Sequence, residues 1–146
     1  MTEINVFSPK IPLSELQKDE IADFLVRELG EFGDPKKEVI ACLTYAMEGK
    51  KGPGGLVLVA GTLSNPEAVL VVNHTGMSGY IPEHILVYLA VLTNQRRKGL
   101  GSKMLEQLLE RVSGGVALHV EPNNPARRLY DKLGFTNKYL EMRLSR

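Results

Sequence analysis

The stretch from Gln95 to Lys103, "QRRKGLGSK", holds the residues best suited to bind an anion. Three basic residues precede glycines at 99 and 101, and an apolar pattern typical of a helix follows. The first-turn N–H groups of a helix lack intrahelical partners and attract negative charge. Glycine at both positions removes side chains that would keep a phosphate from those amides. The segment therefore predicts a phosphate-binding loop, and the alternative is an exposed basic turn.

The spacing of this loop distinguishes three known phosphate-binding patterns. A Walker A loop requires G-x-x-x-x-G-K-[ST], but no glycine stands five residues before Gly101, and Ser102 precedes the lysine. A dinucleotide fingerprint needs a third glycine where Met104 stands, although Glu121 lies where its acidic residue would be, so this site stays open as an alternative. The third pattern, R-x-x-G-x-G, is met by Arg96, Gly99 and Gly101.

The elements around the loop place it at the end of a central strand. "ILVYLAVL" (Ile85–Leu92) is a continuous apolar run, which predicts a strand buried on both faces. A helix is predicted from about Leu100 to Val112, and a strand at Val116–Glu121 completes a strand-helix-strand unit with parallel pairing. The predicted apolar stripe of that helix is Leu100, Met104, Leu105, Leu108 and Leu109. Ligands of open α/β sheets bind at the carboxyl ends of such strands.

The N-terminal half predicts a strand, two helices and a strand pair. A strand at Ile4–Ser8 is followed by a helix that a capping box of Ser14 and Gln17 begins and Gly30 ends. Asp34 is predicted to cap a second helix, with Pro35 in its first turn. After a loop at Gly49–Gly55, two buried strands, Leu56–Ala60 and Ala68–Val72, form an antiparallel pair. The buried positions of the two helices are Ile21, Phe24, Leu25, Leu29, Val39, Ile40, Leu43, Ala46 and Met47.

The C-terminal part predicts a short helix and a last strand. Asn124 and Pro125 open the helix, Gly134 closes it, and its apolar face is Ala126, Leu129, Tyr130 and Leu133. A strand is expected within Lys138–Leu144. We therefore predict one α/β domain over residues 1–146, with a mixed, mostly antiparallel sheet and helices on both faces.

Composition and charge narrow the function classes. The net charge of +1 argues against nucleic-acid binding, but residues 1–83 carry −5 and residues 84–146 carry +6, which suits an anionic ligand of limited size. The chain has no apolar run long enough for a membrane span and no signal-peptide pattern, so a cytoplasmic location is expected. Cys42 is the only cysteine and is expected to pack as a small apolar residue, and no spacing of ligands predicts a metal site.

Two further motifs give the loop a family resemblance. "LAV" (Leu89, Ala90 and Val91) stands before Arg96, and "NNPARRLYDKLGF" fits N-x-x-A-x-x-L-Y-x-x-L-G-F from Asn123 to Phe135. Together with R-x-x-G-x-G, these motifs resemble those of the GNAT N-acetyltransferases, in order and in spacing. They span residues 85–135, about a third of the chain. The resemblance implies a GNAT-like fold, with acceptor-side helices at about 14–50 and an acyl-CoA-binding core at about 84–135.

The resemblance implies that an acetyl group moves from acetyl-CoA to a primary amine by direct attack in a ternary complex. The backbone of Leu89, Ala90 and Val91 would pair with the pantetheine arm of the cofactor. The pyrophosphate would bind the loop, whose residues are Arg96, Arg97, Lys98, Gly99, Leu100, Gly101 and Ser102. The alternative to phosphate binding is that the three basic side chains are charges exposed to solvent and that the two glycines only form a turn.

The remaining site residues each have two interpretations. Asn123, with Ala126 near it in the motif, is expected to contact pantetheine. The alternative is that Asn123 only initiates the last helix. Tyr130, at the position of the family's tyrosine, is expected to protonate the departing CoA thiolate as a general acid; the alternative is a core tyrosine whose hydroxyl bonds a neighbour.

The general base is not evident, because Ile85 and Val87 occupy the positions where some family members carry one. Glu83 is a candidate if the strand extends back to it. Proton loss through water is the other main route, and His74, His84 and His119 are further candidates that are expected to be structural.

The acceptor itself is expected to be a small-molecule or protein amine, and the acidic N-terminal half favours a cationic one. Because 11 residues follow Phe135, the sequence leaves little room for the two last strands of the family. One wall of the acceptor pocket would then stay open or come from a second subunit in a homodimer. A non-catalytic acyl-CoA-binding sensor or partner module is the alternative function, and a nucleotide-binding domain is a third.

Overall fold

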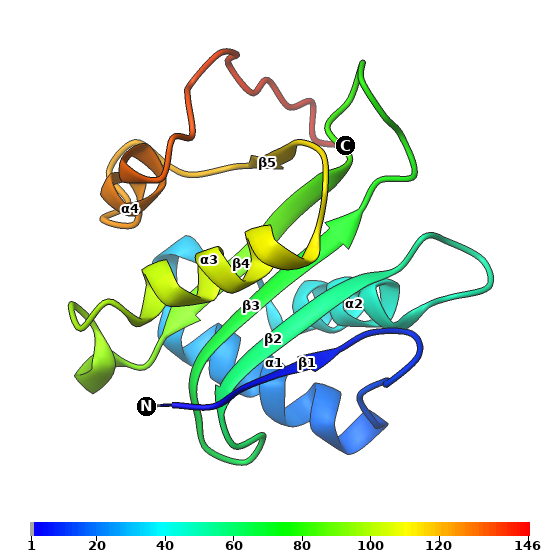
Figure 1. The fold of residues 1–146 in the computed structure, drawn as a ribbon, viewed down its shortest axis with the longest axis vertical. Coiled ribbons are helices and arrows are strands. Elements are labelled where there is room, and N and C mark those ends of the chain that lie inside the picture. The colour runs from blue at the N-terminus through cyan, green and yellow to red at the C-terminus, as the bar shows by residue number, and fades with distance from the viewer. Residues whose placement is uncertain (1) are drawn as a thin grey trace.

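The computed structural model describes residues 2–146, and a five-stranded sheet in the order β1-β2-β3-β4-β5 forms its centre (Figure 1). Neighbouring strands are antiparallel from β1 to β4, whereas β4 and β5 run parallel. The strands are β1 (Ile4–Phe7), β2 (Gly55–Gly61), β3 (Pro66–His74), β4 (His84–Val91) and β5 (Val116–Leu118). The predicted α/β class with a mixed, mostly antiparallel sheet is confirmed.

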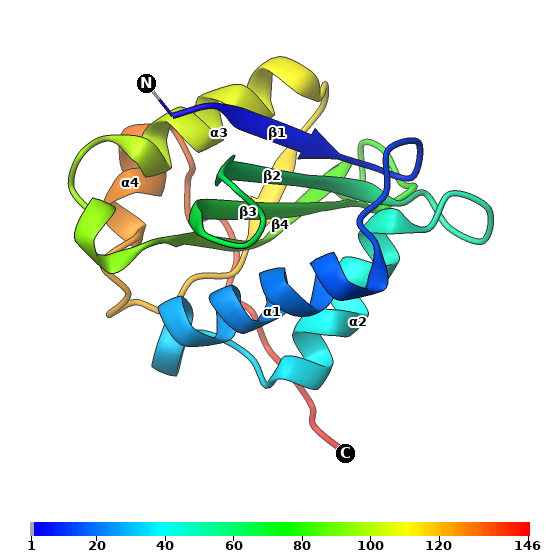
Figure 2. The ribbon, with the colours of Figure 1, turned by 90° about the horizontal axis from the view of Figure 1, so that it is seen from below.

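Helices cover both faces of the sheet, with α1 and α2 on one side and α3 and α4 on the other (Figure 2). Their bounds are α1 (Glu15–Leu29), α2 (Lys36–Met47), α3 (Leu100–Arg111) and α4 (Arg127–Lys132), with 3-10 turns η1 (Gly30–Phe32) and η2 (Thr93–Gln95). Each face has its own core cluster. Phe24 and Leu43 belong to the cluster under α1 and α2, and Met104 and Tyr130 belong to the one under α3 and α4.

The start of α1 follows its sequence signal, but the start of α2 does not. Gln17 N–H donates to Ser14 Oγ at 3.1 Å and Ser14 N–H donates to Gln17 Oε1 at 2.9 Å, which confirms the capping box. The predicted cap of α2 by Asp34 is wrong, because Pro35 is the cap residue. The Asp34 carboxylate instead accepts a hydrogen bond from the Tyr88 hydroxyl at 2.6 Å. Asp34 therefore bonds a residue that is distant in the chain instead of capping the helix that follows it.

The strand that leads to the loop is less buried than the sequence predicts. Leu86, Tyr88 and Ala90 are buried, but Ile85 is 36% exposed. Ile85 pairs with Ala117 of β5, but its side chain lines an open cavity. Beyond Leu86, β4 has no strand on the side of β5 in the described part of the chain. Predicted β5 was also too long, since it ends at Leu118 rather than Glu121.

The C-terminal strand predicted within Lys138–Leu144 is wrong, because residues 135–146 contain no helix or strand. A strand is stable only when a neighbour pairs its backbone, and no described segment forms such a ladder with these residues. One predicted helix position also differs: Leu109 is 43% exposed, so the buried stripe of α3 ends with Leu108.

Candidate active site

The loop between β4 and α3 presents free backbone donors at a helix N-terminus. Gly99 is the cap residue of α3 and makes no side-chain cap, while its carbonyl accepts the N–H of Lys103 at 3.1 Å. The N–H groups of Leu100, Gly101 and Ser102 lie in the first turn, where no intrahelical acceptor exists. Together with the helix dipole, they form a site suited to a phosphate.

The two glycines of the loop serve different physical needs. Gly99 has φ +82°, a left-handed backbone conformation that side chains disfavour, although a Cβ there would meet nothing within 4 Å. Gly101 has an ordinary backbone, but a Cβ there would lie 3.1 Å from Leu129 Cδ2. Gly99 therefore allows the turn into the helix, and Gly101 allows α3 to approach the segment that carries α4.

Arg96 anchors the loop to the rest of the protein. Its Nε donates to Val91 O at 2.9 Å and its Nη2 donates to Glu28 O at 2.8 Å. The Glu28 carboxylate accepts both the N–H and the hydroxyl of Thr93, each at 2.9 Å. Burial alone would raise the pKa of Glu28, but the hydrogen bonds from Thr93 and the guanidinium of Arg27 outweigh it and lower that pKa. The loop is therefore fastened to the end of α1 as well as to β4.

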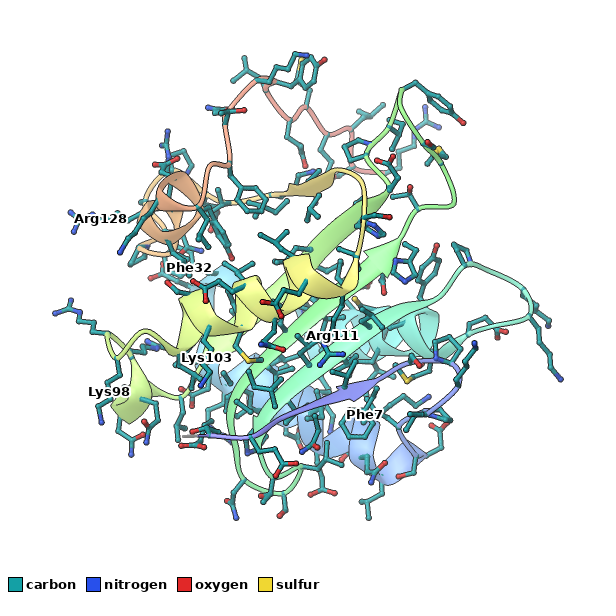
Figure 3. All side chains as sticks on the ribbon, viewed as in Figure 1. Phe7, Phe32, Lys98, Lys103, Arg111 and Arg128 are labelled. Carbon is teal, nitrogen blue, oxygen red and sulfur yellow. The ribbon has the colours of Figure 1, made fainter. Side chains whose placement is uncertain are left out.

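Apart from Arg96, the basic side chains around the loop form no ion pair within residues 2–146. Arg97 and Lys98 are exposed, and Arg97 has φ +65°, a strained value for a residue with a side chain. Figure 3 shows Lys98, Lys103 and Arg128 on the same side of the molecule, around the start of α3. Lys103 belongs to the stretch that the sequence predicts to bind an anion, whereas Arg128 was not singled out, because only the fold brings α4 to this side.

A notch in the sheet runs from this loop toward the middle of β4. Val71 pairs with Tyr88 but Val72 pairs with Leu86, so Val87 is an extra residue, a β-bulge. From this bulge to Val91, no described strand pairs with β4 on the side of β5. β4 and β5 begin as neighbours and separate beyond Leu86, which leaves an open backbone edge.

The backbone of this edge is suited to pair with an extended chain that contains amides. Leu92 N–H donates to Glu67 O at 2.8 Å toward β3. Because backbone groups alternate along a strand, those of Leu89 and Val91 turn to the open side. Val91 O already accepts Arg96 Nε there, so the N–H of both residues and the C=O of Leu89 remain for a ligand. Ala90 turns its backbone groups to β3.

Asn124 and not Asn123 initiates the turn before α4. Asn124 Oδ1 accepts the N–H of Ala126 at 2.9 Å, and Ala126 is partly buried against the core. The side chain of Asn123 is exposed and forms no hydrogen bond with any described residue. This geometry rules out helix initiation as the role of Asn123. The contact of Asn123 with a cofactor stays a prediction.

Tyr130 lies in the core, and its hydroxyl has no protein partner among residues 2–146. The residue is 7% exposed and its ring packs edge-on against Phe135, with centroids 5.6 Å apart. Burial raises the pKa of Tyr130 to about 12. The phenol therefore stays protonated at neutral pH and can donate a hydrogen bond, as a general acid must.

Glu83 holds the turn between α3 and β5. Its Oε1 accepts the N–H of Gly115 at 2.9 Å, and its Oε2 accepts the hydroxyl of Ser78 at 3.4 Å. The hydrogen bond from Gly115 is the main reason why the pKa of Glu83 is lowered. A lowered pKa makes a weaker base, so the geometry favours a structural role for Glu83.

His74 and His84 lie at the same end of the sheet and form a hydrogen bond with each other. His84 Nε2 lies 2.7 Å from Ser113 O, and His84 Nδ1 lies 2.8 Å from His74 Nδ1. Since a carbonyl only accepts, His84 Nε2 carries a proton, and His74 Nδ1–H donates to His84 when both rings are neutral. His119 is exposed. None of the three is placed in the notch.

An apolar cavity of about 320 Å³ lies beside the bulge, on the side of α2. Its lining residues are Tyr45, Asn73, His74, Thr75, Met77, Ile85 and Val87. A larger hollow of about 630 Å³ lies between residues 8–10 and 47–53, away from the loop. The smaller cavity adjoins the open edge of β4, and it is the better place for a second substrate.

Within residues 2–146, no group of three or more His, Cys, Asp or Glu side chains is arranged to hold a metal ion. No helix of this part of the chain is long and apolar enough to cross a membrane. Burial raises the pKa of Cys42 to about 11, and its sulfur accepts a hydrogen bond from Asn73 Nδ2 at 3.4 Å. Its thiol therefore stays protonated at neutral pH.

Comparisons with known proteins identify the fold and the family. The chain matches the acetyltransferase (GNAT) domain over residues 53–137, which include the loop, the notch and α4. A comparison with curated protein sequences finds no match.

Solved structures share the fold at low sequence identity. A GNAT-family acetyltransferase from Streptococcus pneumoniae TIGR4 has a TM-score of 0.71 and 16% identity, covering 100% of this chain and 98% of that chain. The ribosomal-protein-S18-alanine N-acetyltransferase from Escherichia coli has a TM-score of 0.67 and 21% identity, covering 95% and 80%. Aminoglycoside N-acetyltransferase AAC(6')-Iy in complex with CoA has a TM-score of 0.66 and 12% identity, covering 100% and 96%.

Proposed function

This chain belongs to the GNAT acetyltransferase family, and we propose that it transfers an acetyl group from acetyl-CoA to a primary amine. The observation that carries the proposal is the continuity between an anion site and an open strand edge. The first turn of α3 lies at the end of β4, and the unpaired edge of β4 runs from there to the bulge at Val87. This path suits a ligand with phosphates at one end and an amide-containing arm at the other.

Each part of the donor would have its own place on this path. The pyrophosphate would accept hydrogen bonds from the amides of Gly99 to Ser102, with Arg97 and Lys98 adding positive charge. The pantetheine arm would pair with the backbone of Leu89 and Val91, and Asn123 would contact it from the side of α4. Arg96 would act mainly by fixing the loop, because two of its donors are already bonded to Val91 O and Glu28 O.

The acetyl group would then lie near the bulge, between the notch and the apolar cavity beside Ile85 and Val87. Direct attack by an amine held there converts a two-body encounter into a local one, which supplies much of the rate. An alkyl ammonium must first lose a proton, at a cost of about 4–5 kcal/mol at pH 7. Because the lining of the cavity near the bulge is apolar and Glu83 has a lowered pKa, we propose that water takes this proton.

Tyr130 would donate a hydrogen bond to the sulfur of CoA as the thiolate departs. Its phenol is protonated at neutral pH and has no protein partner within the described residues. An acid at this point is expected to contribute about 10²–10⁴-fold to the rate.

The acceptor would be cationic, because carboxylates lie on the α2 side of β4, the side on which the apolar cavity also lies. The Asp34 carboxylate accepts a hydrogen bond from the Tyr88 hydroxyl at 2.6 Å. The pKa of Tyr88 is raised mainly by burial, and the negative charges of Asp34 and Glu38 raise it further, so both carboxylates lie near this hydroxyl. A panel of polyamines, aminoglycosides, lysine-containing peptides and acidic amino compounds tests this point. Turnover restricted to neutral or acidic compounds would contradict a cationic acceptor.

One observation favours a second function, an acyl-CoA-binding sensor or partner module. Ile85 and the bulge residue Val87 carry no group that can take a proton. The two functions are distinguished by incubating the protein with acetyl-CoA and the amine panel while free thiol is measured. Thiol release that depends on the amine supports the transferase, whereas tight binding without release supports the sensor. A cytoplasmic location is proposed for either function, from the sequence features alone.

A further inference from the structure

The apolar cavity beside the bulge has a lining without carboxylate, ammonium or guanidinium groups. Its volume of about 320 Å³ is at the small end of ligand sites in proteins, which span roughly 300–1,000 Å³. Aromatic and aliphatic side chains form most of the wall: Tyr45, Met77, Ile85 and Val87. None of the seven lining residues is Asp, Glu, Lys or Arg, and the ring of His74 is bonded to His84. The cavity therefore suits a compact, apolar body.

The polar side chains of this lining have used their donors and keep free acceptors. The hydroxyls of Tyr45 and Thr75 each donate to a main-chain carbonyl, at 2.7 and 2.8 Å. Asn73 Nδ2 donates to Cys42 Sγ at 3.4 Å, whereas Asn73 Oδ1 is buried and has no hydrogen-bond partner among residues 2–146. A carboxylate on a ligand therefore finds no free side-chain donor in this lining. The N–H groups of an amine, in contrast, can donate to the hydroxyl oxygens of Tyr45 and Thr75.

Negative charge lies at one end of this cavity. Asp34 and Glu38 are near the hydroxyl of Tyr88, the residue that follows the bulge. Glu38 and Tyr45 are seven positions apart on α2, so the helical period places them on one face, two turns from each other. An ammonium group is therefore attracted toward the Val87 end of the cavity. This end adjoins the open edge of β4.

We propose that the acceptor is a small primary amine with one positive charge and an apolar body, an alkylamine or arylalkylamine, which binds in this cavity. This inference rests on the proposed acetyl transfer, in which an ammonium and acetyl-CoA give an amide, the CoA thiol and one proton. The nitrogen lies at the Val87 end, and the body contacts Met77 and Ile85. A polyamine or an aminoglycoside would bury a further ammonium against an apolar wall, and a free amino acid would bury a carboxylate without a donor.

Two matched pairs of amines test the two charges separately. Steady-state release of thiol at saturating acetyl-CoA is measured for hexylamine and hexanediamine, which differ by one ammonium group. It is also measured for phenethylamine and free phenylalanine, which differ by one carboxylate. Hexylamine and phenethylamine are each expected to have a kcat/KM about tenfold or more above that of the paired compound, because the lining offers no partner to the additional charge.

A carboxylate placed in the wall is expected to reverse the preference within the first pair. Met77 lines the cavity from a loop and is 39% exposed, so Met77→Asp is expected to fold and to use hexanediamine better than hexylamine. A reversed preference cannot result from misfolding. Tyr80→Asp, in the same loop but outside the lining, is the matched control at an 81% exposed residue and is expected to keep the wild-type preference. The rise in Tm on adding CoA is expected to be equal in both variants and the wild type.

A wild type that uses hexanediamine, spermidine or an aminoglycoside better than hexylamine would overturn this acceptor class while leaving acetyl transfer in place. So would an unchanged preference in Met77→Asp, or better use of hexanoyl-CoA than of acetyl-CoA, which would assign the cavity to the acyl chain. Thiol release with none of the amines would instead contradict the proposed transferase. The cavity is then tested by saturation-transfer NMR of the CoA complex, where binding of hexylamine but not hexanediamine supports the assignment and any other result overturns it.

Discussion

Gly99 is the residue whose conformation most directly determines the shape of the proposed pyrophosphate loop. We predict that Gly99→Ala lowers the free energy of unfolding and weakens CoA binding. The backbone at Gly99 has φ +82°, and a side chain in this left-handed region costs about 1–2 kcal/mol. Nothing lies within 4 Å of the added Cβ, so the cost comes from the backbone alone. For a domain of this size each kcal/mol lowers Tm by about 2–4 °C.

Gly101→Ala is the matched comparison, because it tests the steric contact of an added side chain and not the conformation of the backbone. Its Cβ would lie 3.1 Å from Leu129 Cδ2, a contact that a small shift of the leucine relieves. Alanine also gains up to about 1 kcal/mol over glycine within a helix. We therefore expect Gly101→Ala to stay within about 1 kcal/mol of the wild type. Gly99→Asn should recover part of the loss, since asparagine tolerates this conformation.

The assay is thermal unfolding of the three variants and the wild type, each with and without CoA. Equal Tm values for Gly99→Ala and the wild type, with an unchanged shift by CoA, would refute the reasoning about the loop. A loss in Gly101→Ala larger than in Gly99→Ala would refute the assignment of the two roles.

Three other perturbations test the site. Tyr130→Phe is expected to keep CoA binding while slowing turnover at least about 10²-fold in steady-state kinetics, and equal turnover would remove the acid role. Glu28→Gln is expected to destabilise the fold by about 1–2 kcal/mol in urea unfolding and to weaken CoA binding, because it weakens the contacts of residue 28 with Thr93 and Arg96. Glu31→Gln, at an exposed residue, is the control and should change neither the stability nor the binding. The pKa of His74 is lowered, first by burial and then by the charge of His84. The folded state therefore binds a proton at His74 less readily than the unfolded state, so the contribution of His74 to stability is complete above about pH 6.5 and is lost as the pH falls below that value. Thermal unfolding between pH 5 and 7 should show a smaller slope in His74→Gln, and an unchanged slope would contradict this assignment.

The local signals in the sequence were sufficient for most of the fold. The capping box at Ser14 and Gln17, the apolar run of β4 and the glycines after it involve neighbours in the chain, so their physics can be evaluated without a structure. Asp34 shows the limit of that reasoning. The same side chain can cap a helix or accept a hydrogen bond from Tyr88, which is 54 residues away, and only the fold decides between them.

The site was predicted from motif positions, but the roles of several side chains depend on tertiary contacts. Arg96 has the spacing of a phosphate ligand, and its guanidinium bonds Val91 O and Glu28 O. Glu83 has the chemistry of a base, and its carboxylate holds Gly115. The notch could not be predicted, because it results from the bulge at Val87 and the early end of the pairing between β4 and β5.

The C-terminal segment, residues 136–146, shows a further limit, since its alternating pattern predicts a strand but does not supply the neighbour that a strand needs. The apolar face of Leu140, Met142 and Leu144 is a sound signal of strand character. Pairing, however, needs a second backbone, and no described strand pairs with this segment. The pattern therefore indicates the conformation that the segment can adopt, and tertiary contacts decide whether the strand forms.

The most direct test of the central claim is thermal unfolding with acetyl-CoA, CoA, NAD and ATP in parallel. A ligand at 100 times its Kd stabilises the folded state by about 2.7 kcal/mol, which corresponds to a rise in Tm of roughly 5–10 °C here. We predict that acetyl-CoA and CoA give this rise, that NAD and ATP do not, and that Gly99→Glu abolishes it. No shift with either CoA compound, or a larger shift with NAD or ATP, would contradict a cofactor path built from the α3 loop and the open edge of β4.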